Sequence, residues 1–462
     1  MGFRNSKIVE TWVGIYAILI FKLVSTVSGI LLHMEQWLQK LVSVKACETK
    51  ALLWSFSNFF CLLCSYYILR PMRDEMGIIG GVDNLQWLFT GTFVAMLAVV
   101  PLFGWVSSRY PRKRLLPLVY YFFIINMLVF YGLFQFDVVY IGVARAFFIW
   151  VSVFNLFVVS VFWSFMADLF SNAQARRLFG FIAAGGTAGA LAGPLLTTAL
   201  AVPLGPANLL WISALFLLLA VVCLHRLIAW RKDNTDDARD NPQVLPEDQA
   251  IGGNPFAGIS LVLHSPYLLG ICALMLLFTT LATFLYFQQA QIIRDSFTDS
   301  GQRTAVFAAI DLAVNSLTIL IQVFLTGRLV KWLGLAGTLL LVPVLLGIGF
   351  LLLGLTPVLG VLVVVQVVRR AGNYAIMRPA REMLYVVLGR EEKYKAKNFI
   401  DTVVYRGGDV VSAWAYTGLR TLGLGLGEIA FVAVPLAALW GWIAYGLGRQ
   451  QTRLAITQRD TT

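Results

Sequence analysis

Long apolar runs, separated by short polar segments, are the main pattern of the chain. Twelve runs of about twenty residues span 51–70, 85–107, 115–135, 138–167, 177–200, 206–228, 267–290, 303–326, 333–355, 357–380, 396–419 and 427–447. They are continuous rather than alternating, and each is long enough to cross a bilayer as a helix. Because a bilayer admits only helices and closed barrels, the pattern predicts an all-α membrane protein with twelve transmembrane helices.

Basic residues crowd the alternate loops. They are Arg109, Arg112, Lys113 and Arg114 after the second run, Arg176 and Arg177 after the fourth, Arg231, Lys232 and Arg239 after the sixth, Arg328 and Lys331 after the eighth, and Arg390, Lys393, Lys395 and Lys397 after the tenth. Cytoplasmic loops of membrane proteins carry such an excess. We therefore expect both ends of the twelve-helix unit to face the cytoplasm, in a bacterial inner membrane.

The polar segments also divide the chain. Residues 231–260 begin with many charges, two prolines and no periodicity, which predicts a cytoplasmic linker between the halves 51–230 and 261–448. Residues 449–462 form a cytoplasmic tail. The extension 1–50 contains an apolar stretch at 12–32. It is an extra helix, an interfacial anchor or, if translation starts at Met34, an artefact, and the sequence leaves these alternatives open.

Composition excludes several classes of protein. Hydrophobic residues make up 59% of the chain and charged residues 13%, against about 25% charged in soluble domains. The net charge of +12 is spread over loops instead of forming one patch, so we expect no nucleic-acid partner. The five cysteines lie in or beside apolar runs, and Cys61 and Cys64 form a C-x-x-C without a second pair. With three scattered histidines and no phosphate-cradling loop, we predict no metal, no cofactor and no enzymatic activity.

The two halves repeat each other in the same direction. Arg73-Asp74 recurs as Arg294-Asp295, Gly104 as Gly327, and Ala175-Arg176 as Ala396-Lys397, each 221 to 223 residues later. Parallel repeats of this kind are typical of transporters, whose substrate site lies near the midplane between the halves. The repeats therefore predict a transporter of two six-helix units.

Small residues recur within the fifth run. Its sequence GFIAAGGTAGALAGP contains Gly180, Gly185, Gly189, Gly193 and Pro194. Glycines at four-residue intervals are typical of close contact between membrane helices. The spacing of Gly180, Gly189, Gly193 and Pro194 resembles the antiporter motif of the major facilitator superfamily, although Thr197 and Thr198 replace its closing glycine pair. Either interpretation suits a moving bundle.

A second segment carries the same resemblance. GWVSSRYPRKR, at 104–114, resembles that superfamily's loop between helices 2 and 3, with Gly104, Arg109, Arg112 and Lys113 matching. Ser108 stands in place of the motif's acid. The resemblance implies the major-facilitator fold.

Two further segments are similar to a particular branch, the ATP/ADP antiporter family of nucleotide transporters. LRPMRD at 69–74 resembles the family's motif at the end of helix 1. YAIMRPAREMLYVVLGREEKYKAKNFID at 374–401 resembles a longer family segment, in which the residues that match are Tyr374, Ala375, Pro379, Arg381, Glu382, Met383, Lys393, Lys395, Lys397, Ile400 and Asp401. The resemblance covers about 51–447 and implies a carrier of nucleotides.

The chain departs from that family at three places. No carboxylate occurs at 151–155, Arg378 replaces the acid before the proline, and Asp409 follows Gly408 where a lysine is common. These departures predict a divergent member that transports a related organic anion.

Charged residues at membrane depth are candidates for the substrate site, because they are costly in lipid and normally face the bundle interior. On the first run, Tyr66, Tyr67, Arg70 and Arg73 share one helical face that offers stacking for a base and cationic forks for phosphate. Asp74 would balance the empty site. The alternative is that Arg73 and Asp74 neutralise each other at an exposed helix end.

The tenth and eleventh runs supply the other candidates for the substrate site, and these are Arg369, Arg370, Asn373, Arg378 and Asp409. The alternative for the two adjacent arginines is structural pairing with Asp311, Asp409 or Asp401. We assign gating or structural roles to Arg109, Arg112, Gly189, Gly193, Pro194, Arg381, Glu382, Lys395, Lys397 and Asp401.

The sequence therefore predicts a secondary transporter, acting as a monomer, that moves a nucleotide or similar organic anion by alternating access, as an antiporter. A proton-coupled carrier of another solute, such as a siderophore or drug, is the alternative. An intramembrane enzyme is disfavoured because no converging set of catalytic residues is present. A non-transporting receptor or scaffold is a third class, which a failure of the two halves to change accessibility in cysteine labelling would support.

Overall fold

The computed structural model describes residues 46–109, 112–135, 140–234, 257–389, 395–397 and 399–460. Every regular element in these ranges is a helix. The all-α prediction is therefore confirmed. The predicted extension up to residue 45, the linker at 235–256 and Lys393 lie outside the described residues.

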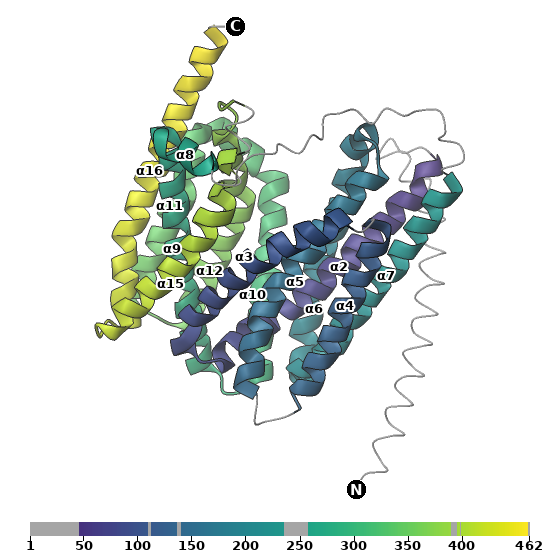
Figure 1. The fold of residues 1–462 in the computed structure, drawn as a ribbon. Coiled ribbons are helices and arrows are strands. Elements are labelled where there is room, and N and C mark those ends of the chain that lie inside the picture. Colours follow the sequence, from purple (N-terminus) through teal and green to yellow (C-terminus); the bar gives the residue numbers. More distant parts are fainter. Residues whose placement is uncertain are drawn as a thin grey trace.

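The helices form two groups that follow each other along the chain. The first contains α2 (Ala46–Ile79), η1 (Val82–Asn84), α3 (Leu85–Arg109), α4 (Arg112–Leu133), α5 (Tyr140–Leu169), α6 (Asn172–Leu204), η3 (Pro206–Asn208) and α7 (Leu209–Asn234). The second contains α8 (Ala257–His264), α9 (Pro266–Ser296), α10 (Ser300–Phe324), α11 (Thr326–Leu355), α12 (Leu359–Gly372), η6 (Asn373–Met377), α13 (Arg378–Leu384), η7 (Ile400–Val404), α15 (Tyr405–Thr421) and α16 (Leu426–Asp460). Figure 1 shows the groups side by side, with colours from purple to teal on one side and from green to yellow on the other. We call them the N-half and the C-half.

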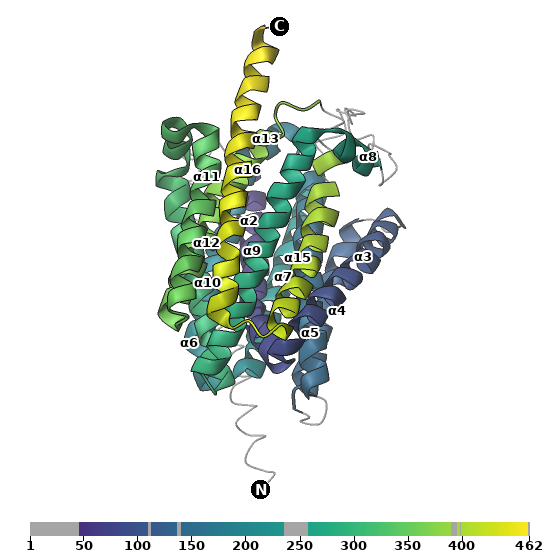
Figure 2. The ribbon, with the colours of Figure 1, turned by 90° about the vertical axis from the view of Figure 1, so that its left-hand side faces the viewer.

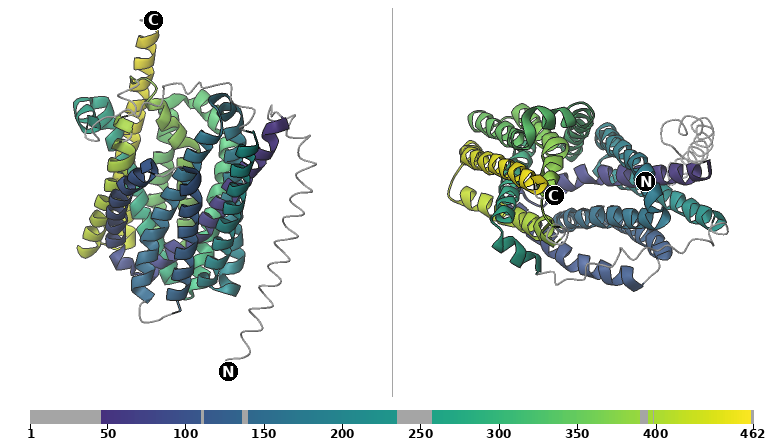
Figure 3. Two further views of the ribbon diagram at one scale, coloured as in Figure 1. Left: turned by 45° about the vertical axis from the view of Figure 1, so that its right-hand side comes forward. Right: turned by 90° about the horizontal axis from the view of Figure 1, so that it is seen from above.

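Eleven helices in the described ranges are long and apolar enough to span a membrane. The twelfth predicted span corresponds to η7 and α15, which carry Arg406, Asp409 and Arg420 and are therefore less apolar. This segment packs between α9 and α3, which shelters Asp409 at 19% exposure, whereas Arg406 is 39% exposed and Arg420 is exposed near the helix end. Figures 2 and 3 show α15 running alongside α9 within the bundle.

The outside of the bundle is apolar. Large hydrophobic side chains such as Leu118, Trp332 and Trp442 are more than half exposed. In water this surface would be an aggregation hazard, but it suits the hydrocarbon of a bilayer. Inside, two clusters of buried apolar residues lie mainly in one half each, around Phe162 and around Trp440.

The first span is longer than the hydrophobic run that predicts it. The run ends at Arg70, whereas α2 continues to Ile79 as one helix. Hydropathy falls at Arg73, Asp74 and Glu75, but these side chains point into protein and only 0–22% of each is exposed. The charged segment is therefore part of the spanning helix, and the alternative of an exposed helix end is wrong.

Close contact between α2 and α6 explains the glycine spacing. A Cβ added to Gly185, Gly189 or Gly193 would lie only 2.3–2.8 Å from a backbone carbonyl oxygen of α2. The partners are the oxygens of Phe56, Phe60 and Cys64, one helical turn apart. The interpretation of these glycines as a helix–helix contact is therefore confirmed.

We predict that Gly189→Ala destabilises the protein by about 1–3 kcal/mol, because the new methyl group overpacks a backbone contact that cannot yield. The measurement is thermal unfolding of the purified protein in detergent. Gly180→Ala on the same helix is the control, since nothing lies within 4 Å of a Cβ at that position. Equal melting temperatures for both variants would contradict the contact.

Candidate functional site

Two neighbouring pockets lie between the two halves, and we call them the wide lobe and the narrow lobe of the central cavity. The wide lobe has a volume of about 530 Å³ and is lined from α2, α5 and α6 of the N-half and from α10, η6 and α13 of the C-half. The narrow lobe, of about 200 Å³, is lined from α2, α3, α9, α12, η6 and α15. Arg70 and Tyr374 line both lobes, so these two residues mark the point where the lobes meet.

Four arginines line the narrow lobe. Arg70 and Arg73 come from α2 of the N-half, whereas Arg369 and Arg370 lie near the end of α12 of the C-half. Asp74 and Asp409 line the same lobe. Ionisable groups at this density within a membrane bundle mark a substrate pathway by default.

Asp311 on α10 neutralises two of these arginines. Its carboxylate is 2% exposed, and Oδ1 lies 2.6 Å from Nη2 of Arg370, whereas Oδ2 lies 3.6 Å from Nε of Arg70. The pairing of Arg370 with Asp311 is one of the alternatives that the sequence left open. Because Arg70 belongs to the other half, the same carboxylate also links the halves.

Arg73 has a different environment. Its Nη1 lies 3.5 Å from Oδ1 of Asp74, and its guanidinium lies 4.1 Å from the ring centroid of Phe148. The hydroxyl of Tyr286, on α9, donates to the same Asp74 oxygen at 2.9 Å. A residue of the C-half thus holds a carboxylate of the N-half.

Arg369 has no carboxylate within ion-pair distance among the described residues. Its Nε donates to Oε1 of Gln366 at 3.0 Å, and Gln366 in turn donates to Gln289. A neutral amide partner orients the guanidinium but does not compensate its charge. Among the described residues, Arg369 is therefore the arginine of the narrow lobe that has no direct carboxylate contact.

Two π-helical turns shape the C-half side of the cavity. η6 closely follows Arg369 and Arg370 and contains Asn373 and Tyr374. η7 precedes α15, which carries Asp409. A π-helical turn inserts an extra residue and changes which side chains face inward, and such turns are frequent at functional sites. Here η6 precedes Arg378, which lines the wide lobe.

All nine residues that the sequence predicts for substrate binding line one lobe or the other. Tyr66 and Arg378 line the wide lobe, Arg70 lines both, and the narrow lobe takes Arg73, Asp74, Arg369, Arg370, Asn373 and Asp409. Arg294-Asp295, the sequence repeat of Arg73-Asp74, is not among them. Its two side chains form an exposed ion pair at the end of α9.

The residues predicted for gating or structure lie elsewhere. Arg381 pairs with Asp401 at 3.4 Å and Lys397 with Glu382 at 2.5 Å, both within the C-half. Gly189 and Gly193 contact α2, and Pro194 follows them in α6. Arg109 ends α3, Arg112 begins α4 and Lys395 precedes η7.

Sequence reasoning missed an ion pair that joins the halves. Arg303 of α10 donates to both carboxylate oxygens of Glu75 on α2, at 2.7–3.1 Å, and the Glu75 side chain is fully buried. Arg303 also donates to the carbonyls of Phe297 and Thr298. The sequence does show that Glu75 and Arg303 each lie close to an apolar run, but it contains nothing that indicates a contact between them.

An aromatic layer lies beside this ion pair. Phe89 of α3 packs against Tyr286 and Phe287 of α9, with ring centroids 5.5 and 5.6 Å apart, and Phe287 packs against Tyr416 of α15 at 4.9 Å. Phe89 and Tyr286 line the narrow lobe. Phe287 and Tyr416 line a separate pocket of about 310 Å³. The layer thus separates the central cavity from that pocket.

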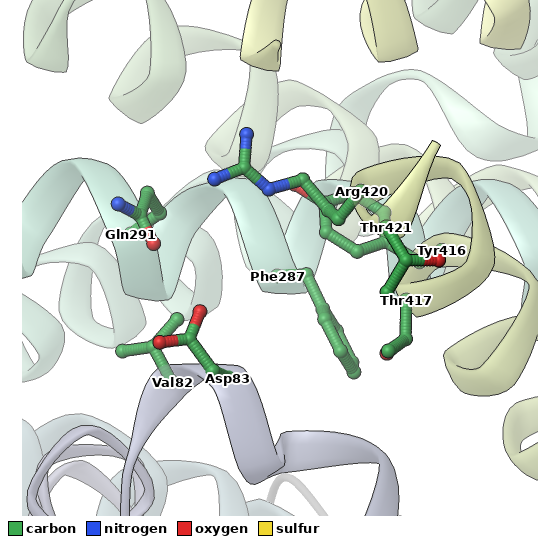
Figure 4. A pocket seen from close by; sticks show the side chains of 8 residues that line it. All are labelled: Val82, Asp83, Phe287, Gln291, Tyr416, Thr417, Arg420 and Thr421. Carbon is green, nitrogen blue, oxygen red and sulfur yellow. The ribbon is translucent and has the colours of Figure 1, made fainter. Parts of the chain in front are cut away.

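The separate pocket lies at the end of the bundle opposite α8 and the C-terminus. Figure 4 shows Val82 and Asp83 of η1 facing Gln291 of α9, with Arg420 of α15 nearby. In Figure 1, α8 and the end of α16 lie at the top, whereas the start of α16 lies at the bottom. We call the two ends of the bundle the α8 end and the η1 end. Glu75–Arg303 and the aromatic layer join the two halves toward the η1 end.

Within the described residues, no group of three His, Cys, Asp or Glu side chains is placed to hold a metal ion. The site instead consists of arginines, amides and aromatic rings in a cavity between two helical halves. These features, with eleven apolar spans and a lipid-type surface, define a multi-pass membrane transporter.

The chain belongs to the Major Facilitator Superfamily, whose family model matches residues 52–384. It is also similar to ADP,ATP carrier protein 1 of Chlamydia muridarum, with 22% identity over 458 aligned residues that cover 85% of this chain and 86% of the carrier. The same carrier of Chlamydia trachomatis is 22% identical over 311 residues, 60% of this chain and 59% of the carrier. The resemblance read from the sequence is thus confirmed.

Solved structures of transporters share the fold. A bacterial homologue of the iron transporter ferroportin in an inward-facing state has a TM-score of 0.62 at 13% identity, covering 87% of this chain and 98% of that one. The nucleoside transporter NupG has a TM-score of 0.56 at 12% identity, with coverage of 89% and 99%. These relatives and neighbours are transporters, and the prediction that the protein is not an enzyme is confirmed.

Proposed function

We propose that the protein is a secondary transporter that exchanges a nucleotide, or a similar phosphorylated organic anion, across the inner membrane. The observation that carries the proposal is the arginine cluster of the narrow lobe, in which Arg369 has no carboxylate partner among the described residues. An uncompensated cation at membrane depth is costly. A bound anion would remove that cost, so the cluster is suited to binding one.

Phosphate fits this cluster better than a single carboxylate does. Arginine presents a planar fork of donors that matches phosphate oxygens in a bidentate way. Arg73 and Arg369 reach the lobe from opposite halves, so a polyanion with several phosphate oxygens can contact both. The similarity to chlamydial ADP,ATP carriers supports a nucleotide as the anion.

The contacts between the halves support alternating access. Glu75–Arg303 and the aromatic layer around Phe89 join the two halves toward the η1 end, whereas the wide lobe extends from Arg70 along α2 toward Phe59, in the direction of the α8 end. Transport would require these contacts to separate while contacts form at the α8 end. From the basic residues in the loops at that end, we propose that it faces the cytoplasm.

A proton-coupled carrier of another solute is the second candidate. Asp74 and Asp409 both line the narrow lobe, and a carboxylate in such a cavity can take up and release a proton during the cycle. Uptake that follows an imposed pH gradient and needs no phosphorylated substrate would favour this candidate.

Arg73→Ala is expected to abolish exchange in proteoliposomes loaded with ADP and supplied with labelled ATP. Each charge-assisted hydrogen bond lost costs about 1.5–3 kcal/mol, and Arg73 also balances Asp74 at 3.5 Å. Arg73→Lys should keep part of the rate, because the charge stays while the bidentate fork is lost. Full activity of Arg73→Ala would remove this residue from the site, and no exchange by the native protein would refute the proposed substrate.

A further inference from the structure

The two lobes of the central cavity differ in chemistry. The narrow lobe has four arginines and two aspartates among its lining residues. The residues that line the wide lobe include no aspartate or glutamate, and its two arginines stand at its borders, Arg70 toward the narrow lobe and Arg378 at the start of α13. The surface between them is mainly aromatic, amide, aliphatic or small. A ligand that fills both lobes can therefore place its anionic part among the arginines of the narrow lobe and an uncharged part along the surface between Arg70 and Arg378.

Aromatic rings form one wall of the wide lobe. Tyr66 and Tyr67 lie edge to face with ring centroids 5.2 Å apart, and Phe59 lies about two turns earlier on the same helix. Tyr374 approaches from the C-half, at the junction of the lobes. Rings on both sides of a cavity favour a flat, conjugated ligand, because stacked and edge-to-face contacts stabilise it.

Amide side chains complete the wall from both halves. Asn315 of α10 donates its Nδ2 to the carbonyl of Ala190 at 2.7 Å, which fixes the side chain and leaves its Oδ1 as an acceptor. Asn155 of α5 is half-buried in the lobe, and no side-chain hydrogen bond is formed by it within the described residues. An amide offers both donors and acceptors, which suits the edge of a nitrogen heterocycle.

We propose that the wide lobe binds the heterocyclic base of a nucleotide while the arginines of the narrow lobe hold its phosphates, with Arg70 and Tyr374 at the junction. This inference rests on the proposed function and adds the orientation of the substrate to it. A ligand in this pose touches Asn155 and Tyr66 of the N-half together with Asn315 and Tyr374 of the C-half. It therefore joins the two halves along its whole length.

The test compares the binding of ADP and of inorganic pyrophosphate to the purified full-length protein by isothermal titration calorimetry. Pyrophosphate carries the anionic part of ADP without the base. The native protein should bind ADP at least about tenfold more tightly, because stacking and base-edge hydrogen bonds each contribute. Asn155→Leu should weaken ADP binding by about five- to tenfold and leave pyrophosphate binding unchanged.

Ser152→Ala on the same helix is the matched control, because Ser152 donates to the carbonyl of Phe148 and lies outside the lobe lining. It should bind both ligands like the native protein. Equal affinities of the native protein for ADP and pyrophosphate would overturn the inference, as would a variant at Asn155 that weakens both ligands or neither. Those results leave phosphate recognition in place, whereas a native protein that binds neither ligand refutes the proposed function itself.

Discussion

Replacing Arg369 with glutamine is expected to reduce substrate affinity by about ten- to a hundredfold while the protein still folds, because a charge-assisted hydrogen bond contributes about 1.5–3 kcal/mol. The guanidinium of Arg369 is held by the neutral amide of Gln366 and by no carboxylate among the described residues. Removing its charge therefore leaves no buried acid without a partner. Initial rates of nucleotide uptake over a concentration series measure the effect as a raised KM.

Arg370→Gln provides an informative contrast. Arg370 lies 2.6 Å from Asp311, and removing this nearer partner leaves the buried carboxylate with Arg70 alone, at 3.6 Å. We expect this variant to lose stability as well as transport. Arg294→Gln is the control, because the Arg294–Asp295 pair is exposed at the end of α9 and should leave transport unchanged. Normal affinity in Arg369→Gln would contradict the assignment of the anion site.

Glu75→Gln is expected to open the η1 end of the cavity. The Glu75 carboxylate is fully buried and receives hydrogen bonds from Arg303 across the two halves. Breaking a buried pair of this kind costs about 3–5 kcal/mol, and the cost falls on the conformation that contains the pair. The population therefore shifts toward the conformation in which the halves are apart at this end.

Cysteine labelling measures this shift. With the native cysteines replaced, Thr283→Cys in the narrow lobe should react slowly with an impermeant reagent outside intact cells, and at least about tenfold faster when Glu75→Gln is added. Asp295→Asn is the matched control and should not change the rate, because that residue is exposed. Two further single-cysteine variants, Asp295→Cys and Lys331→Cys, place an exposed thiol at each of these positions. Their labelling shows which end of the bundle the reagent reaches.

Exchanging the charges of Glu75 and Arg303 tests the same ion pair through transport activity. Glu75→Arg alone should arrest transport, and adding Arg303→Glu should restore only part of it, since a glutamate cannot donate to the carbonyls of Phe297 and Thr298 as Arg303 does. Unchanged labelling in Glu75→Gln would mean that this pair does not hold the η1 end closed.

Hydrophobic length was sufficient to predict the helices but not their ends. The apolar run at 51–70 predicts a helix that stops at Arg70, because hydropathy treats each charge as exposed to lipid or water. In the folded protein, Asp74 and Glu75 are buried against Tyr286 and Arg303, so the helix continues for more than two further turns. Tertiary contacts thus override the local signal.

For the candidate site, the sequence predicted the charged residues but not their partners. Charged residues close to or inside apolar runs, such as Arg73 and Arg370, identify the cavity because lipid exposure would be too costly for them. The Glu75–Arg303 ion pair could not be predicted, because the two residues are 228 positions apart. Only the packing of α2 against α10 brings them together. The sequence also did not predict the amides of the wide lobe. Asn155 is uncharged and gives no strong signal, and its position in a cavity depends on the packing of α5.

The similarity between the halves also has a limit. Arg73-Asp74 and Arg294-Asp295 recur at matching positions in the sequence, yet the first pair lines the cavity and the second is exposed. A repeat predicts equivalent helices, but each helix end meets different neighbours. In contrast to α9, α2 therefore contributes through its charged end both to the arginine cluster and to the ion pair near the η1 end.

Uptake of labelled ATP, ADP and adenosine into proteoliposomes preloaded with unlabelled ADP tests the central claim most directly. If the arginines of the narrow lobe bind the phosphates of the substrate, ATP and ADP will exchange and adenosine, which lacks the anion, will not. Uptake of adenosine without uptake of either nucleotide, or no uptake of any of the three, would contradict the account.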